Sequence, residues 1–564
     1  MRAFNSISNL NLNTSMIYLK REARLTIHGM QELMLTRRLF SELGSNNERR
    51  LKMKKRIIPF ILTLSLILTP AFTPQIVSEA YGTILHEAFR FDERIHVQID
   101  GKRAEFEDQK PIVVDGRTLV PVRGVFEAMG FDVDWNPASR QATLTSEDYE
   151  VILTIGSAEF TTNGISHTLD VPAQIINGRT MIPIRAVLES AGYYVSWDAQ
   201  VRTVVVSSKP FRYILIQGEP FNTAWTVIDL WGKDLFHEDL IMLTSFNNMT
   251  SLILSGNRIH DILPLESMTN LINLSLLGWE SETTPQMSNL TNLEHLSLSG
   301  SQINDLTPIS ELTNLESLFL SGNQIMDLTP LSRLESIEAL TIHGRSITDI
   351  TPISNMTSLK YLGLVLEEIN DISMLSDLEN LMYLSLQARG MLGIMPLYEL
   401  PNLIGLNLWG PQIEDFKAIS KLTDLTYLMI LCNELEDLSP LTNLTNLSYL
   451  ILSGSKISDI SSLVNLTNLE FLSLRSNRLN DITVLENLTN LEELSLDIEV
   501  SDLTPISGIQ SLKYLWINSN ELQDISPLSN LTNLTHVFIA SSNYIDTTPV
   551  ENLPNLIHLQ VTKW

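Results

Sequence analysis

The chain has 564 residues, of which 44% are hydrophobic, so it is long enough to bury a large core and to form several domains. Its formal net charge is −27, although the first 80 residues hold 12 of the 38 Lys and Arg and only 5 of the 65 acidic residues. A surface this acidic repels nucleic acid and anionic lipid, so nucleic acid is excluded as a partner. The single cysteine, Cys432, excludes an intramolecular disulfide.

The first predicted element is an export signal. Met53 is followed by three basic residues and then by an apolar run over 57–72, and small residues precede Ala80. This order of basic, apolar and small residues is typical of a secretory signal peptide. We therefore expect residues 53–80 to be a signal peptide that is cleaved near Ala80.

The residues before this signal have no place ahead of a signal peptide. We expect translation to begin at Met53 and residues 1–52 to be a mis-assigned N-terminal extension. Pro59 and Pro70 make the apolar run a poor membrane anchor, so no stable membrane anchor is expected after cleavage. A single-pass anchor over 57–72 is the alternative.

An internal duplication with a spacing of 62 residues follows. The motif Asp/Asn-Gly-Arg-Thr-x-x-Pro-x-Arg begins at Asp115 in the first copy and at Asn177 in the second. Each copy predicts a hairpin, a short helix ended by glycine, and two strands joined by a turn. The last arginine of the motif, Arg123 or Arg185, is expected to be a buried partner of the glutamate four residues later rather than a substrate ligand.

This pattern resembles the N-terminal stalk domain of copper amine oxidases. The resemblance covers about residues 93–208 and implies two repeats, over 95–148 and 151–207. It does not imply the oxidase reaction, which belongs to a separate domain with a modified tyrosine and three histidine ligands. The ten histidines show no H-x-H or H-x-x-H spacing, so we expect neither a metal nor a cofactor.

From about Met249 to Val561 the apolar residues recur every 22 residues, with the spacing L-x-x-L-x-L-x-x-N-x-L, and we expect the leucine-rich repeat domain to span 225–564. This period predicts a solenoid of about 15–16 coils. Leucines such as Leu318 and Leu320 point inward from a short strand, and the residues beside them point outward. We expect about sixteen strands, including a looser capping coil near 228–235, in one parallel sheet.

The 22-residue repeat with Asp-Leu-x-Pro-Leu on its return segment resembles the repeats of internalins, which are bacterial surface proteins that bind host receptors. The resemblance covers about 246–564. Together the two resemblances imply an internalin-like leucine-rich repeat protein that carries the stalk domain and is secreted by a Gram-positive bacterium. The expected fold class is α+β, with a small duplicated β-rich stalk domain followed by a leucine-rich repeat solenoid with a parallel concave β-sheet.

Polar residues recur in the coils at fixed phases. One aspartate per coil, from Asp261 to Asp546, is expected to accept backbone N–H groups at the start of a 3₁₀ turn. A calcium ladder is the alternative, although partner carboxylates at regular offsets are missing. An asparagine at the position just after the strand is expected to bond the backbone of neighbouring coils. The asparagines at this position are Asn257, Asn323, Asn433, Asn477 and Asn520.

The central coils depart from this pattern. Arg345, Glu367, Arg389 and Pro411 replace the asparagine, so these coils are expected to be less regular. Cys432 stands where the repeat usually has glycine, and we expect a small filler rather than a reactive thiol.

The outward positions of the strands carry many aromatic side chains. We expect a column exposed on the concave face, because nothing within the chain is left to bury it, and such a column indicates a partner. The expected ligand-binding residues are Phe319, Tyr361, Tyr383, Trp409, Tyr427, Tyr449, Phe471, Tyr514, Trp516 and Phe538.

These features predict a secreted or cell-surface binding protein that recognises a protein ligand, from a host or a bacterial surface, through the concave face. Aromatic rings also stack on sugars, so a glycan ligand stays open. A structural or glycan-binding cell-wall protein, held at the wall through the stalk domain, is the alternative. No G-x-S-x-G, H-E-x-x-H or phosphate-loop motif is present, so we expect no enzyme. The expected location is extracellular, with wall association open.

Overall fold

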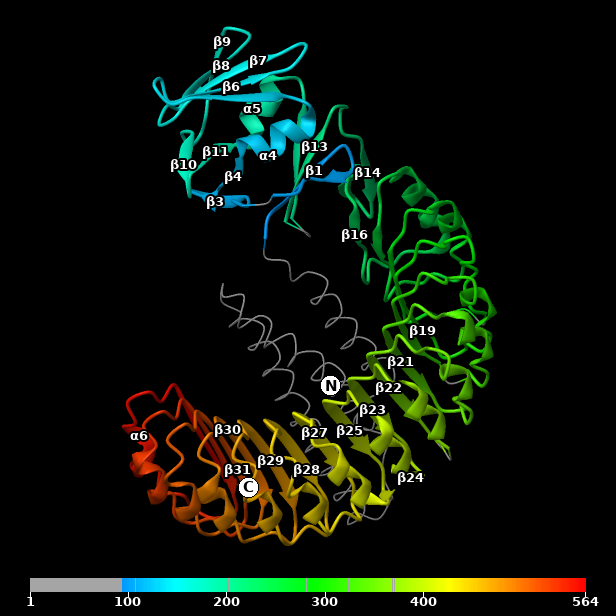
Figure 1. Ribbon diagram of the computed structural model, residues 1–564, viewed down its shortest axis with the longest axis vertical. Coiled ribbons are helices and arrows are strands. Elements are labelled where there is room, and N and C mark those ends of the chain that lie inside the picture. Colours follow the sequence, from blue (N-terminus) through cyan, green and yellow to red (C-terminus); the bar gives the residue numbers. More distant parts are fainter. Residues whose placement is uncertain are drawn as a thin grey trace, which may run out of the picture. The chain divides into compact units, whose positions relative to one another are not determined.

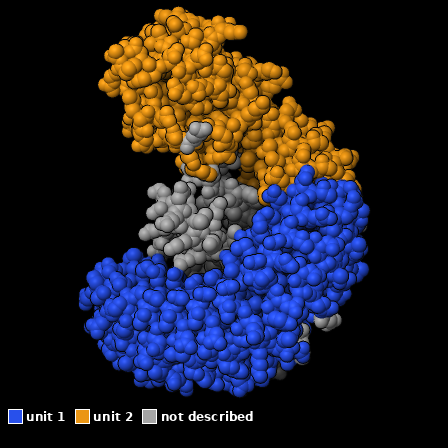
Figure 2. All heavy atoms as spheres, in the orientation of Figure 1, with its two compact units in different colours: residues 1–81, 282–284, 297–564 blue, residues 82–281, 285–296 orange. Residues whose placement is uncertain are grey.

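The computed structural model describes residues 94–106, 108–199, 202–279, 281, 283–322, 324–367, 369 and 371–563 (Figure 1). The expected extension and signal peptide lie outside these residues. The chain forms two compact units, one containing 297–564 and the other containing 82–281 and 285–296 (Figure 2). None of the helices within the described residues is long and apolar enough to cross a membrane.

The duplicated module has the same elements in each half. The first half contains β3 (Ile112–Val114), β4 (Arg117–Pro121), α4 (Val122–Phe126), η1 (Glu127–Met129), β5 (Asp132–Asn136) and β6 (Gln141–Thr145). The second half contains β10 (Gln174–Ile176), β11 (Arg179–Pro183), α5 (Ile184–Ser190), β12 (Tyr194–Asp198) and β13 (Thr203–Ser207). This is the predicted order of hairpin, helix and two strands.

The short helices follow from the motif. Pro121 holds an extended backbone immediately before α4, and Gly130 ends the helical segment with a φ of +85°. Val122, Val125 and Phe126 form the buried face of α4. The helix therefore packs its apolar side on the sheet and leaves its polar side in solvent.

The motif arginines pair as predicted, but on the solvent side of the helices. Arg123 Nε lies 3.0 Å from Glu127 Oε1, and Arg185 Nε lies 4.0 Å from Glu189 Oε1. All four side chains are exposed, so the expectation of buried pairs is wrong. The apolar face of each helix occupies the core, and the i,i+4 pair therefore lies on the opposite face, where it contributes well under about 1 kcal/mol.

The two halves of the module exchange hairpins. The remaining strands are β1 (His96–Ile99), β2 (Lys102–Arg103), β7 (Glu150–Thr154), β8 (Glu159–Thr162) and β9 (Ile165–Thr168). The hairpin that precedes the second half pairs through β7 with β6 of the first half, whereas β1 pairs in parallel with β13 of the second half. The hairpins β3–β4 and β10–β11 also pair with each other, through β4 and β11. Each sequence repeat is therefore completed by strands of the other.

The repeat array forms one 16-stranded sheet in chain order, as the 22-residue period predicts. A two-stranded hairpin, β14 (Tyr213–Ile216) and β15 (Glu219–Asn222), precedes it. The strands of the sheet are β16 (Val227–Asp229), β17 (Ser251–Ile253), β18 (Asn273–Leu277), β19 (His295–Ser299), β20 (Ser317–Ser321), β21 (Ala339–Gly344), β22 (Tyr361–Leu366), β23 (Tyr383–Gln387), β25 (Gly405–Trp409), β27 (Tyr427–Leu431), β28 (Tyr449–Ser453), β29 (Phe471–Ser476), β30 (Glu493–Ile498), β31 (Tyr514–Asn518), β32 (His536–Ser541) and β33 (His558–Lys563).

Short helices occupy the return segments. They are η2 (His237–Ser245), η3 (Leu263–Ser267), η4 (Thr307–Ile309), η5 (Thr329–Arg333), η6 (Thr351–Ile353), η7 (Ser373–Asp377), η8 (Met395–Glu399), η9 (Phe416–Lys421), η10 (Ser439–Leu441), η11 (Ser461–Leu463), η12 (Thr483–Asn487), η13 (Thr504–Ile506), η14 (Ser526–Asn530) and α6 (Thr548–Glu551). Over 297–564 the strands line the concave side and these helices the convex side (Figure 1). Between them the inward leucines of successive coils, such as Leu318 and Leu320, form a continuous core.

The aspartates act as predicted at the start of the return segments. In eleven coils an aspartate Oδ1 accepts the backbone N–H of the residue two positions later, at 2.8–3.0 Å. Asp415 differs, because its own φ is +52° and its side chain makes no such bond. Hydrogen bonds from a Thr or Ser hydroxyl and backbone N–H lower the carboxyl pKa in seven members, namely Asp327, Asp349, Asp371, Asp437, Asp481, Asp502 and Asp546.

Among the described asparagines predicted for the position after the strand, Asn257 is the one that bonds the backbone of neighbouring coils. Asn257 Nδ2 donates to Leu230 O and Leu254 O, both at 2.8 Å. In later coils the serine hydroxyls of Ser476 and Ser519 donate to the preceding coil instead. The prediction is wrong for Asn433, Asn477 and Asn520. These side chains are exposed, because a small residue fills the buried position one place earlier in the chain. Asn323 lies outside the described residues.

A second asparagine ladder connects the coils on the return side. In nine Leu-Thr-Asn-Leu or related segments the asparagine donates from Nδ2 to a carbonyl oxygen 23 residues earlier, as Asn468 does to Thr445 O at 2.8 Å. The same bond is made by Asn270, Asn292, Asn380, Asn402, Asn446, Asn490, Asn533 and Asn555. These bonds satisfy backbone groups that the strands leave unpaired.

The central coils are irregular, as predicted. Beside Arg389 and Pro411 the chain adds two short strands, β24 (Met391–Gly393) and β26 (Gln412–Glu414), which pair in parallel outside the main sheet. Cys432 follows as a buried side chain, and this burial raises the pKa of its thiol. A buried, protonated thiol fits the predicted role of filler.

Candidate ligand-binding surface

Parallel pairing without offset sorts the outward side chains into columns. Tyr427, Tyr449 and Phe471 are cross-strand partners on β27, β28 and β29. Neighbouring strands are about 4.8 Å apart, which is close to the stacking distance of aromatic rings. The register therefore places these rings on top of one another.

An apolar group on this face contains those three rings. Tyr427 and Tyr449 stack with ring centroids 4.8 Å apart and an interplanar angle of 17°, and Tyr449 and Phe471 stack at 4.0 Å and 8°. We refer to the following six residues as the apolar cluster: Tyr427, Met429, Leu431, Tyr449, Ile451 and Phe471. Tyr427, Met429 and Ile451 are its buried centre, and the other three are half-buried at its surface.

The remaining predicted aromatic residues form separate groups. Tyr361 and Tyr383 stack at 5.2 Å and 10° on β22 and β23. Gly405 separates Tyr383 from Tyr427 in the column, and Glu493 separates Phe471 from Tyr514. At the ends of the column, the aromatic contacts join Phe319 to His343, Tyr514 to His536, and Phe538 to His558.

The column is less exposed than the sequence predicts. Phe319, Tyr383 and Tyr427 are only 3%, 4% and 8% exposed, so the expectation of solvent-exposed side chains is wrong for them. Each stacked ring covers part of its neighbour, an effect that hydropathy alone does not reveal. The other seven residues are half-buried: Tyr361, Trp409, Tyr449, Phe471, Tyr514, Trp516 and Phe538.

Burial also keeps two titratable side chains of this face uncharged near neutral pH. It raises the pKa of Tyr383 to about 12, and it lowers the pKa of His343 to about 4. Both side chains are therefore neutral at physiological pH. Tyr383 and His343 therefore contribute stacking and hydrogen-bonding groups to this face rather than charge.

Leu431 and Ile451 belong to the apolar cluster but are absent from the predicted site. Their signal lies in the strand sequences Tyr-Leu-Met-Ile-Leu over 427–431 and Tyr-Leu-Ile-Leu over 449–452, which are apolar at inward and outward positions alike. A strand that is apolar on both faces is typical of one that is covered on both faces.

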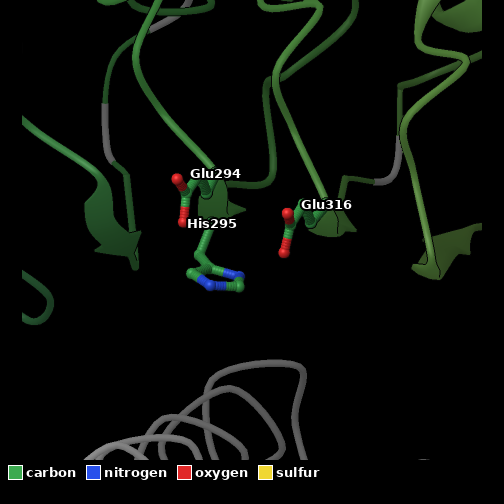
Figure 3. Close-up of side chains that lie close together, drawn as sticks. All are labelled: Glu294, His295 and Glu316. Carbon is green, nitrogen blue, oxygen red and sulfur yellow. The ribbon is translucent and has the colours of Figure 1, made fainter.

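Among the described residues, one group of three side chains has the composition of a metal site. Ligand atoms of Glu294, His295 and Glu316 lie within 4.8 Å of one another (Figure 3). Exposed acidic groups gather in this way without a metal, so no site is assigned to them.

Comparison with known families assigns both parts of the chain. Residues 98–206 match the copper amine oxidase N-terminal domain, which is not the catalytic part of that enzyme. Residues 291–333, 445–487 and 510–558 match leucine-rich repeats. Both family resemblances predicted from the sequence are supported. No curated protein matches the chain.

The similar solved structures are repeat proteins. A leucine-rich repeat protein of Leptospira interrogans is 21% identical, with 59% of this chain and 89% of that chain covered and a TM-score of 0.50. An internalin (inlF) of Listeria monocytogenes is 29% identical, with 57% and 89% covered and a TM-score of 0.42. InlJ of the same organism is 20% identical, with 57% and 75% covered and a TM-score of 0.41. The predicted fold class, a β-rich module followed by a leucine-rich repeat solenoid, is confirmed.

Proposed function

Since the chain is an internalin-like leucine-rich repeat protein that carries a copper amine oxidase N-terminal domain, we propose that it is a secreted or cell-surface, non-enzymatic protein that binds a protein ligand through the concave face of its repeats. The repeats suggest a protein-binding role in general. Beyond this general role, we propose the extracellular location of the protein, the concave face as its binding surface and the residues that contact the ligand.

The observation that carries the proposal is the apolar cluster on β27–β29. The inward leucines already fill the solenoid core, so the repeat does not require apolar side chains at outward positions. Tyr449, Phe471 and Leu431 form a half-buried surface on a rigid base made by Tyr427 and Met429. Aromatic anchors on a rigid base are typical of interface hot spots, because little side-chain entropy is lost on binding.

Export to the cell exterior rests on the signal-like segment 53–80. The stalk domain is the part of the chain that we propose for attachment to the cell wall. Neither proposal depends on the concave face.

A pull-down separates the candidate ligands. The full chain is immobilised and exposed in parallel to a host-cell extract and to purified cell wall, and captured proteins are identified by mass spectrometry. For a captured protein, Tyr449→Ala combined with Phe471→Ala is expected to weaken binding by about 2 kcal/mol or more, roughly thirtyfold. The control is Tyr544→Ala, which removes a ring that is 79% exposed and lies outside the apolar cluster.

Equal affinity of the double variant and the parent would reject the apolar cluster as the binding surface. Capture of wall polysaccharide without any protein would instead favour the glycan-binding wall protein.

A further inference from the structure

Beyond the apolar cluster, the outward face changes character over β29–β31. The middle outward column there contains Ser473, Ser495 and Trp516 as cross-strand partners. The next column contains Arg475, Asp497 and Asn518, again as cross-strand partners. The indole of Trp516 therefore lies between Ser495 on one side and Phe538 of β32 on the other, beside a row of polar groups.

The polar row is a connected network. Arg475 Nε lies 3.1 Å from Asp497 Oδ2, and Asn518 Nδ2 donates to Asp497 Oδ1 at 2.6 Å. Asp497 thus holds a guanidinium on one side and an amide on the other. Because both neighbours are fixed by the same carboxylate, their remaining donors and acceptors are held in place.

One atom of this network still needs a partner. With Nδ2 donating to Asp497, Asn518 Oδ1 is buried and accepts no hydrogen bond from the described residues. A buried carbonyl oxygen without a donor is destabilising, because it has lost its hydrogen bonds to water. A ligand hydroxyl would remove this cost, while the guanidinium N–H groups of Arg475 that do not face Asp497 can donate to ligand oxygens.

Trp516 lies at the right spacing to complete such a site. It precedes Asn518 by two residues on β31, so both side chains leave the same face with Cα atoms about 6.6 Å apart. Its cross-strand partners are Ser495 on one side and Phe538 on the other, so the smaller neighbour lies on the Ser495 side. A flat ring with an apolar face and polar edges would stack on the indole and reach the polar row.

We propose that Trp516, Arg475, Asp497 and Asn518 form a saccharide subsite for a neutral pyranose. The apolar C–H face of the sugar stacks on Trp516, one hydroxyl donates to Asn518 Oδ1, and another accepts from Arg475. The formal net charge of −27 disfavours acidic sugars, so the ligand is neutral. This site is distinct from the apolar cluster and does not depend on a protein ligand.

The test is binding of the full chain to an array of neutral oligosaccharides. One set consists of wall-type amino-sugar oligomers, such as chitohexaose, and the other of neutral N-glycans of glycoproteins. The set that binds identifies the source of the sugar. Affinity for the bound saccharide is then measured by titration calorimetry.

Trp516→Ala and Asn518→Leu are each expected to weaken saccharide binding at least tenfold. The matched control is Trp135→Ala, which removes an exposed tryptophan of β5 that belongs to neither proposed site. If Trp516→Ala impairs folding, Asn518→Leu still decides the question. The proposal is overturned if neither set binds, if Asn518→Leu binds as the parent does, or if Trp135→Ala causes an equal loss.

Discussion

At the scale of single residues, the outward face depends on small local fits. A Cβ on Gly405 would overlap the ring of Tyr383, its cross-strand partner. The sequence places both residues in the aromatic column. The sequence does not reveal that the Tyr383 ring lies against Gly405, because this contact depends on the side-chain conformation of Tyr383 on the neighbouring strand.

Gly405→Ala is therefore expected to displace Tyr383 and to reduce stability by about 1–3 kcal/mol, as overpacking usually does. Urea unfolding measures the change. The matched control is Gly390→Ala, where an added Cβ meets no atom within 4 Å. Equal stability of the two variants would show that the ring moves aside without cost.

Tyr427 is expected to contribute to stability as well as to binding. Its ring is buried within the apolar cluster, so Tyr427→Ala should leave a cavity and cost about 2 kcal/mol or more in the free energy of unfolding. Leu450→Ala, which empties an inward core position beside it, should cost about 2–5 kcal/mol. A Tyr427→Ala variant as stable as the parent would mean that the stacked rings add nothing to folding.

At the scale of elements, the aspartate turns connect the sequence pattern to pH-dependent stability. Their carboxyl pKa values are lowered in the folded chain by the hydroxyl and N–H groups that they accept from. A lowered pKa stabilises the fold above the ordinary carboxyl pKa, and this contribution is lost as the pH falls through the folded value. The sequence predicts these turns well, because the aspartate and the backbone N–H group that it accepts from lie only two residues apart in the chain.

Stability should therefore decline below about pH 4, where these carboxylates take up protons. Replacing Asp327, Asp349 and Asp371 together with asparagine keeps a side-chain oxygen that can accept from the backbone but removes the titrating group. The urea midpoint of this variant is expected to fall less steeply between pH 5 and about pH 3 than that of the parent. Identical slopes would assign the acid sensitivity to other groups.

The exchanged hairpins of the module are an element-scale feature that the repeat period does not reveal. A spacing of 62 residues identifies two copies, but it does not state which hairpin joins which sheet. Here β7 completes the sheet of the first half, and β1 completes that of the second. Pairing between distant strands is decided by tertiary packing rather than by local sequence.

A fragment of residues 93–148 is accordingly expected to be unfolded by circular dichroism, since it lacks β7 and β8. The fragment 93–208 contains all exchanged strands and is expected to fold. A folded short fragment would show that each repeat is an independent unit.

At the scale of the whole molecule, the sequence predicts the solenoid through its strict period and the two-part organisation through two different duplications. The outward chemistry is harder to predict, since it depends on neighbours that lie 22 residues apart. Leu431 and Ile451 illustrate the difficulty, because each appears as one more apolar residue until the register places it beside Tyr449 and Phe471. The proposed function depends on contact between the apolar cluster and a protein ligand.

Site-specific photo-crosslinking tests that claim most directly. A photoreactive phenylalanine replaces Phe471 on the concave face in one variant and Tyr398, an exposed residue of η8 on the convex side, in the other. With a protein captured in the pull-down, we expect a covalent adduct from position 471 and none from position 398. An adduct from position 398 alone would contradict the account and place the ligand on the convex side.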